Sequence, residues 1–362
     1  MEYYFFMITL IDVFVLGIMC VLTKYSEVLN QQQRRWFISS FLLIITISVL
    51  ELVTIVVDQK TPMLRWVNIL ANYLGFGLSP AVPVLLAVAL GKSRSIKYAG
   101  MIEAVYLLFL AVTFPFHIIF YVDANNHYMR GDYFWIYLAV YISGILYLLA
   151  MTLRVAARYQ NKSKRSIYPI AVFLLAGTTV QVTFSHIHVT WLCVSFLSIL
   201  YYVYCNGMWQ QLDQLTGLLN QKCYLNQTAS LSQNGTLVVF DVDDFKQIND
   251  EYGHLTGDRC LEEVAACIKK AYSKEGSCYR VGGDEFCVLL EADSDEERCF
   301  RRLINQLEIK RTKWNILPHV SVGSARFAAG DCAERVKEIA DHNMYQMKKA
   351  HKADKDGDGK EL

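Results

Sequence analysis

The sequence predicts a multi-pass α-helical membrane domain followed by an α+β domain. The first observation is composition: 54% of the 362 residues are hydrophobic and only 19% are charged, which is too apolar for an ordinary soluble protein. The second is distribution, because long apolar runs fill the chain up to about residue 206 and are replaced afterwards by charge-dense sequence. That later part alternates between strand-like and helix-like periods, which predicts a central, mostly antiparallel sheet flanked by helices.

Seven apolar runs predict a seven-helix transmembrane domain over residues 1–206, joined to the next domain by a helical linker, 207–212. Most of the runs approach or exceed the ~20 residues that cross a bilayer. The runs are 5–23, 36–57, 64–90, 98–121, 133–153, 167–185 and 190–205. In the third run, Gly75, Gly77, Pro80 and Pro83 should kink the helix.

The lysine and arginine residues between the runs predict the orientation. They are concentrated after the first, third and fifth runs, and such loops stay on the cytoplasmic side. We therefore expect a plasma-membrane protein with its N-terminus outside and everything after about Met208 in the cytoplasm. Ionisable groups within or beside the spans, Asp12, Glu51, His117, His186 and His188, suggest an extracellular small ligand or a proton as one hypothesis and buried packing as the commoner one.

In the C-terminal part, short apolar segments end in acidic residues. Residues 237–243 form a predicted buried strand with Asp241 and Asp243 on one face, and a short helix follows over 245–254. Residues 280–286 carry two glycines before two acids. Glycines allow positive φ in a tight turn and a close backbone approach to a ligand, while adjacent acids suit a divalent metal. Such a turn alone is often only a hairpin, so the surrounding residues must decide.

Those surroundings resemble the GGDEF diguanylate cyclases over residues 213–352. Four ordered blocks carry the resemblance: the opening DQLTGLLN, 213–220; DVDDFKQIND, 241–250, continuing to Asp258; RVGGDEF, 280–286; and a closing helix from Ala340 to Lys348. The resemblance implies a nucleotidyl-cyclase-like α+β fold. A disordered tail is expected over 353–362.

The resemblance implies an enzyme that condenses two GTP molecules into cyclic di-GMP and releases two pyrophosphates with the help of Mg²⁺ or Mn²⁺. The implied metal ligands are Asp241, the Val242 carbonyl, Asp284 and Glu285, and the implied catalytic residues are Asp284, Lys246 and Glu285. The implied substrate-binding residues are Phe245, Asn249, Asp258, Gly282, Gly283, Lys348 and Lys352. A carboxylate at Asp258 can accept hydrogen bonds from guanine but has no matching donor pair on adenine, so GTP is the expected substrate.

Because one such domain holds one GTP, the resemblance also implies that activity requires a homodimer. No nucleic-acid partner is expected. Two alternatives remain open: a catalytically silent GTP-binding regulatory protein, and a receptor or transporter that uses the C-terminal domain as a scaffold.

Overall fold

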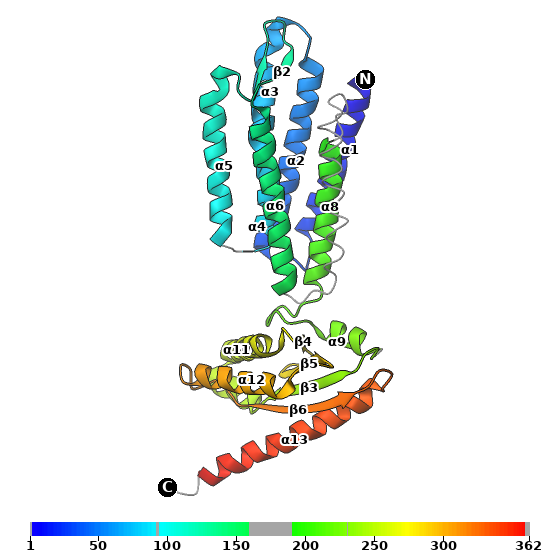
Figure 1. Cartoon of the computed structure of the whole chain (residues 1–362), viewed down its shortest axis with the longest axis vertical. Coiled ribbons are helices and arrows are strands. Elements are labelled where there is room, and N and C mark those ends of the chain that lie inside the picture. Colours follow the sequence, from blue (N-terminus) through cyan, green and yellow to red (C-terminus); the bar gives the residue numbers. More distant parts are fainter. Residues whose placement is uncertain (1, 92–93, 159–189, 230, 359–362) are drawn as a thin grey trace. The chain divides into compact units, whose positions relative to one another are not determined.

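The computed structural model describes residues 2–91, 94–158, 190–229 and 231–358, which divide into an N-terminal unit, Met1–Gln210, and a C-terminal unit, Gln211–Leu362. The helices of the N-terminal unit are α1 (Glu2–Lys24), α2 (Gln31–Val57), α3 (Arg65–Leu78), α4 (Ala81–Ala89), α5 (Arg94–Thr113), α6 (Phe134–Arg158) and α8 (Thr190–Trp209) (Figure 1). Their apolar side chains form one core of buried residues from α1, α2, α4, α6 and α8.

Six helical segments in the described part of the chain are long and apolar enough to cross a membrane. They are Tyr3–Lys24, Gln31–Val57, Pro62–Ala89, Lys97–Phe116, Phe134–Ala157 and Thr190–Trp209. The structure therefore supports six spans where the sequence predicted seven, and the remaining predicted run, 167–185, lies outside the described residues together with His186 and His188. The N-terminal unit is a multi-helix membrane region.

The third span is broken, as its glycines and prolines predicted. It starts with a 3₁₀ turn, Pro62–Leu64, continues as α3 and resumes after Ser79 and Pro80 as α4. Proline has no backbone N–H to donate and its ring displaces the preceding turn, so one continuous helix cannot form here. Gly144 of α6 packs against the restarted helix so closely that a Cβ would lie 2.9 Å from Pro83 Cγ.

The fourth span is shorter than the predicted run 98–121. Helix α5 stops at Thr113, and Pro115 lies in a 3₁₀ turn that ends at His117 with φ of 57°. The chain then forms a small antiparallel hairpin of β1 (Phe120–Val122) and β2 (Tyr128–Arg130). The hydropathy of the sequence had predicted that these aromatic strand residues form the end of a membrane helix, and that prediction is wrong.

The last span, Thr190–Trp209, runs past the predicted end of its apolar run at residue 205, but its helix does not continue through the predicted linker. Helix α8 stops at Trp209, and Leu212 forms a β-bridge with Leu219. The predicted helical linker, 207–212, is therefore helical only in its first residues.

The C-terminal unit is a four-stranded antiparallel sheet with helices on both faces. Its strands are β3 (Gly235–Val242), β4 (Gly276–Arg280), β5 (Glu285–Glu291) and β6 (Val320–Phe327), and their spatial order is β4-β5-β3-β6. Its helices are α9 (Gln221–Thr228), α10 (Phe245–Tyr252), α11 (His254–Tyr272), α12 (Glu296–Arg311) and α13 (Ala333–Asp358). The predicted α+β fold is confirmed, and α13 continues to Asp358, past the predicted end at Lys352.

Alternation along the strands divides the core into two layers. Val238, Phe240 and Val242 of β3 pack with α11 and α12 on one face. Leu237 and Val239 pack on the other face with Val336 and Ala340 of α13 and with Tyr224 of α9. Because Asp241 shares the face of Leu237 and Val239, its side chain lies on the α13 side of the sheet, where it contacts Lys348.

Candidate functional site at the end of the central strand

Two acidic residues lie side by side where the central strands of the C-terminal unit end. In the antiparallel register Asp241 of β3 is opposite Glu285 of β5 on one side and opposite Ser321 of β6 on the other. Directly opposed residues project from the same face of a sheet. The turn acid Asp284 is held at the same place, because its carbonyl oxygen accepts a hydrogen bond of 3.2 Å from the Val242 amide.

The Lys348 ammonium, from α13, contacts the Asp241 carboxylate and forms both a hydrogen bond and an ion pair with it. Burial raises the pKa of the Asp241 carboxyl above its ordinary value, and Lys348 offsets this only in part because Asp284 and Asp243 add negative charge nearby. Burial opposes the charge on Lys348, but the Asp241 contact outweighs it and raises the pKa of Lys348. The site therefore concentrates negative charge and already binds one cationic group.

Asp243 is a buried member of the same acidic group. Its side chain is 5% exposed, and its Oδ1 accepts a hydrogen bond of 2.7 Å from the Ser321 hydroxyl. The backbone of Asp243 is fixed as well, since its amide donates a hydrogen bond of 2.9 Å to the His319 carbonyl oxygen. Asp243 thus anchors the strand end, whereas Asp241 keeps a partly exposed carboxylate.

The paired glycines do not adopt the positive φ that the sequence suggested. Within the described chain the left-handed glycines are Gly91, Gly217, Gly253 and Gly330, so this part of the prediction is wrong. Close approach explains Gly282 instead, because a Cβ there would lie 3.1 Å from Glu285 Oε2. A Cβ on Gly283 would meet nothing within 4 Å, so its backbone faces open space. The other role that the sequence predicted for these glycines, a close approach of a ligand to the backbone, is compatible with this open space.

Arg280 supports the turn from behind, and sequence reasoning assigned it no role. Its guanidinium donates to Gly283 O at 2.7 Å and to Asp213 Oδ1 at 3.1 Å. Burial raises the pKa of Asp213, but hydrogen bonds from Thr216 and the charge of Arg280 outweigh it, so the pKa is lowered overall. Arg280 and Asp213 belong to two separate sequence blocks, 213–220 and 280–286. The presence of both blocks in one sequence was the only sign that these two residues could interact.

A second group of predicted residues lies on α10 and the first turn of α11. Asn249 is packed against Gly257 so tightly that a Cβ on Gly257 would lie 2.0 Å from Asn249 Oδ1 and 3.3 Å from the Phe245 ring. Glycine is therefore required at 257 for this arrangement. Lys246 and Asp258 are exposed, and neither makes a hydrogen bond or an ion pair within the described residues.

One of the predicted residues, Lys352, is only partly described. Lys352 lies in α13, one turn beyond Lys348, but only its backbone is described. The structure thus brings together Asp241, Asp284, Glu285 and Lys348, and separately Phe245, Asn249 and Gly257. Lys246 and Asp258 lie exposed on α10 and α11, the two helices that carry the second group.

The acidic group suits a divalent metal ion. Carboxylate oxygens are hard ligands, and Mg²⁺ is usually bound by one or two carboxylates together with water and substrate phosphates. Within the described chain, no group of three or more His, Cys, Asp and Glu side chains is already gathered around a metal-sized point. A site that borrows ligands from a phosphate is consistent with this, and the Lys348 ammonium shows that Asp241 can bind a positive charge.

Comparison with known proteins identifies the C-terminal unit. Residues 210–354 match the family described as diguanylate cyclase, GGDEF domain. The C-terminal unit is a GGDEF domain. Two similar proteins from Escherichia coli (strain K12) are "Diguanylate cyclase DgcN", 34% identical over 38% of this chain and 36% of that protein, and "Diguanylate cyclase DosC", 32% identical over 38% and 33%. The chain thus spans about a third of the length of the curated relatives it matches.

A solved structure is similar over the same region. The GGDEF domain of DgcB from Caulobacter crescentus in complex with c-di-GMP is 28% identical, covers 39% of this chain and 91% of its own, and superposes with a TM-score of 0.35.

Proposed function

We propose that this protein is a membrane-bound diguanylate cyclase. The observation that carries the proposal is the meeting of Asp241, Asp284 and Glu285 with Lys348 beside the open backbone of Gly283, inside a GGDEF domain. In the proposed reaction the 3′-hydroxyl of one GTP attacks the α-phosphate of another. A 3′-oxygen to phosphorus bond forms, the bond to the β-phosphate breaks and pyrophosphate leaves. A second such step closes the ring of cyclic di-GMP.

The acids at the strand end would hold Mg²⁺ or Mn²⁺ and take part in the proton transfer. Asp241, the Val242 carbonyl, Asp284 and Glu285 are the residues assigned to the metal. When bound, such an ion supplies positive charge to the phosphates and lowers the pKa of the attacking hydroxyl. Asp284 is assigned to accept the hydroxyl proton, because its carboxylate belongs to the turn rather than to the buried core.

The lysines and glycines would hold the triphosphate. Gly282 and Gly283 leave room for phosphate against the backbone, and Lys246 on α10 has a free, exposed ammonium among the described residues. Lys348 is paired with Asp241. Binding of the triphosphate would draw its ammonium toward the phosphates, and the metal would take its place on the carboxylate. Lys352, on the same helix, is assigned to the triphosphate as well. Positive charge placed where negative charge develops lowers the barrier of phosphoryl transfer.

Asn249 and Asp258 would select guanine. Both stand beside Gly257, whose missing side chain allows Asn249 and the ring of Phe245 to approach the start of α11. The Asp258 carboxylate is exposed and uncommitted among the described residues, so it can accept hydrogen bonds from the guanine N1 and N2 donors. Adenine lacks that pair, and a site left with an unpaired acceptor would reject it.

The remaining parts of the proposal concern assembly and placement. Two GGDEF domains, each with one GTP, must face each other, so the active form is a homodimer. The loop charges support a placement in the cell membrane with the N-terminus outside and the GGDEF domain in the cytoplasm beside its substrate. This orientation requires an odd number of crossings, so the run 167–185, outside the described residues, would be the seventh beside the six described candidates. The signal that controls it would act through the membrane helices.

The test uses the full-length protein in lipid nanodiscs with GTP and Mg²⁺, and cyclic di-GMP is quantified by mass spectrometry. Asp284→Asn should reduce the rate at least about 10²-fold, the contribution typical of a positioned acid–base group. Asp293→Asn, which neutralises an exposed acid in the turn after β5, is the matched control and should behave like the parent. An Asp284→Asn variant that is folded and as active as the parent would refute the proposed site.

A further inference from the structure

The chain between the first two membrane helices forms a basic turn, residues 24–35, at the boundary of the bilayer. Lys24 is the last residue of the first candidate span, and Arg34 and Arg35 lie in the first turns of the second. Lys24 and Arg35 are exposed and Arg34 is half-buried. Arg34 Nη1 donates a hydrogen bond of 3.2 Å to the Lys24 carbonyl oxygen, which brings the two ends of the basic turn together.

The helix cap fixes the shape of the basic turn. Asn30 Oδ1 accepts a hydrogen bond of 2.8 Å from the Gln33 amide, and Gln33 Oε1 accepts one of 3.0 Å from the Asn30 amide. This capping box satisfies two free backbone donors at the start of α2. The Arg34 guanidinium has five N–H donors and spends one on the Lys24 carbonyl, so the others can bind a ligand.

The positive charge of the basic turn is not compensated within the N-terminal unit. Among the described residues, Lys24, Arg34 and Arg35 form no ion pair. Glu27 is the only acid between residues 13 and 50, and it is exposed. The segment 159–189, which lies outside the described residues, contains no aspartate or glutamate and so has no carboxylate to offer. The turn therefore presents net positive charge at the level of the lipid headgroups.

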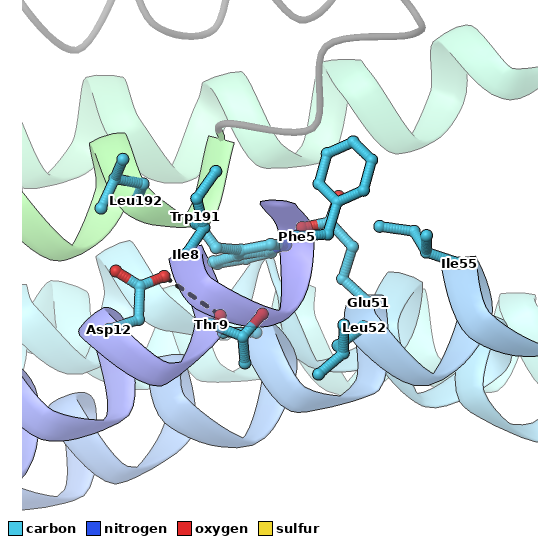
Figure 2. A pocket seen from close by; sticks show the side chains of 10 residues that line it. Phe5, Ile8, Thr9, Asp12, Glu51, Leu52, Ile55, Trp191 and Leu192 are labelled. Atoms are coloured by element: carbon cyan, nitrogen blue, oxygen red, sulfur yellow. Dashed lines mark hydrogen bonds between the residues drawn. The ribbon is translucent and has the colours of Figure 1, made fainter. Parts of the chain in front are cut away.

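An apolar stripe on α1 leads to these charges. Its members recur at helical spacing and are between 44% and 73% exposed; they are Ile18, Val21, Leu22 and Tyr25. The Lys24 ammonium lies 5.8 Å from the centroid of the Tyr25 ring. The opposite face of α1 packs on α2 and α8, where Thr9 and Asp12 line a small cavity with Glu51 (Figure 2). An apolar stripe that ends at cations matches the shape and charge of a phospholipid.

We propose that the basic turn binds the phosphodiester headgroup of one anionic phospholipid, with an acyl chain along the stripe on α1. Arginine donates to phosphate oxygens in a bidentate manner, and Lys24 and Arg35 add charge. The Tyr25 ring lies at the boundary, where aromatic rings with a polar tip are favoured. This is the end that the loop charges predict to be cytoplasmic, and anionic lipids attract basic segments there.

A second copy of the chain fits this surface less well. Two copies joined along the same stripe in one membrane would bring their basic turns together, and like charges so placed repel. Helix pairs in membranes also favour small residues at their contact, whereas this stripe consists of bulky side chains.

The bound lipid would lie beside the helix that leads to the GGDEF domain. Phe37 follows Arg35 by two residues, and its ring packs edge-to-face on Tyr202 and Trp209 of α8, with centroids 5.2 and 6.2 Å apart. Trp209 is the last residue of α8. A headgroup on the basic turn would therefore stabilise the start of α2 where it contacts the end of α8. The site needs no nucleotide and is independent of the cyclase proposal.

The test measures thermal unfolding of the full-length protein in dodecyl maltoside as dioleoylphosphatidylglycerol is added. The parent should show a saturable rise in Tm of about 4 °C, because a ligand bound only to the folded state stabilises it. Dioleoylphosphatidylcholine, with the same acyl chains, and inorganic phosphate, without them, should each have little effect. Arg34→Gln should raise the phosphatidylglycerol concentration at half-effect about tenfold, as expected for one lost contact to a charged group.

Lys97→Gln is the matched control and should keep the half-effect concentration of the parent. It removes one exposed positive charge from α5, which packs on α3 and α4, so it separates the basic turn from general attraction by positive helix ends. If Arg34→Gln does not yield folded protein, Lys24→Gln provides the test, because within the described residues that ammonium contacts only the Tyr25 ring.

Four results would overturn the proposal. An equal rise with phosphatidylcholine would exclude headgroup recognition, and an equal rise with inorganic phosphate would indicate a site for a soluble anion. A Tm that follows protein concentration instead of lipid concentration would indicate a second copy on the stripe. A folded Arg34→Gln or Lys24→Gln variant with the half-effect concentration of the parent would exclude the basic turn. Since no assay uses GTP, failure here leaves the cyclase proposal unaffected.

Discussion

Two aspartates, one in each unit, have different environments and different partners. Asp241 of the GGDEF domain lies at a strand end, with its side chain 14% exposed, and contacts the Lys348 ammonium from another element. Asp12 of the membrane unit is 1% exposed, and its one hydrogen bond comes from the neutral Ser48 hydroxyl. The first acid has a cationic partner built into the chain, whereas the second has none among the described residues.

The difference teaches how each acid can be used. A lysine side chain is long and mobile, so its ammonium can leave Asp241 when metal and triphosphate arrive and can then bind phosphate. No lysine or arginine lines the cavity at Asp12, so its lining residues offer no such exchange. The two acids thus differ in how they can take part in binding, because only Asp241 has a mobile cationic partner among the described residues.

The largest effect is expected from Asp241→Asn. The amide keeps the shape but removes the metal-binding charge, so cyclic di-GMP formation should fall at least about 10²-fold. Mass spectrometry of the product measures this. A folded Asp241→Asn variant that forms cyclic di-GMP as fast as the parent would contradict the assignment of this carboxylate to the metal.

A smaller effect is expected from Lys348→Gln. Loss of one charged contact should weaken binding of a non-hydrolysable GTP analogue by roughly tenfold, measured by isothermal titration. Lys349→Gln is the matched control, because that ammonium lies 4.6 Å from the Tyr345 ring centroid rather than in the acidic site. Equal affinities for the two variants would mean that Lys348 does not bind the triphosphate.

Gly257→Ala tests the packing behind the proposed guanine site. The new methyl group would lie 2.0 Å from Asn249 Oδ1 and must displace that side chain. We expect a KM for GTP several-fold higher and a loss of stability of about 1–3 kcal/mol, the usual cost of overpacking. Steady-state kinetics and thermal unfolding measure the two effects. A KM that stays constant would place guanine recognition elsewhere.

The smallest effect concerns an ion-pair cluster away from both sites. Hydrogen bonds from Arg298 and Cys299 lower the pKa of Glu275 to about 2, and Arg302 also contacts it at 3.2 Å. The charged carboxylate therefore stabilises the fold above its unfolded pKa, and this contribution is lost as pH falls toward 2. Glu275→Gln should cost about 1 kcal/mol at pH 7. In thermal melts the difference from the parent should shrink below about pH 4.5. A difference that is constant with pH would contradict the ion-pair origin.

Local sequence patterns predicted the structure correctly where it depends on a single helix or strand. Alternation over 237–243 placed Asp241 on a sheet face, and Gly75, Gly77 and the prolines Pro80 and Pro83 predicted the broken third span. Patterns failed where the chain turns. Hydropathy extended the fourth span through Phe120, because an aromatic hairpin and a helix end are equally apolar, and it extended α8 through the linker although the helix stops at Trp209.

The sequence predicted which residues belong to the candidate site, but it did not predict which of them contact one another. The motif blocks named Asp241, Asp284 and Lys348, yet only folding shows that Lys348 contacts Asp241 across more than a hundred residues. The spacing of residues along the sequence also does not show that Arg280 donates a hydrogen bond to the Gly283 carbonyl. Nor does it show that Asn249 packs tightly against Gly257. The cavity at Asp12 depends on three helices meeting, which no single span reveals.

The most direct test of the central claim is product identification with the full-length protein in nanodiscs, supplied with GTP and Mg²⁺. The account predicts cyclic di-GMP by mass spectrometry, with two pyrophosphates released per product and no corresponding product from ATP. Bound but unconverted GTP, or a different nucleotide product, from folded and dimeric protein would contradict it.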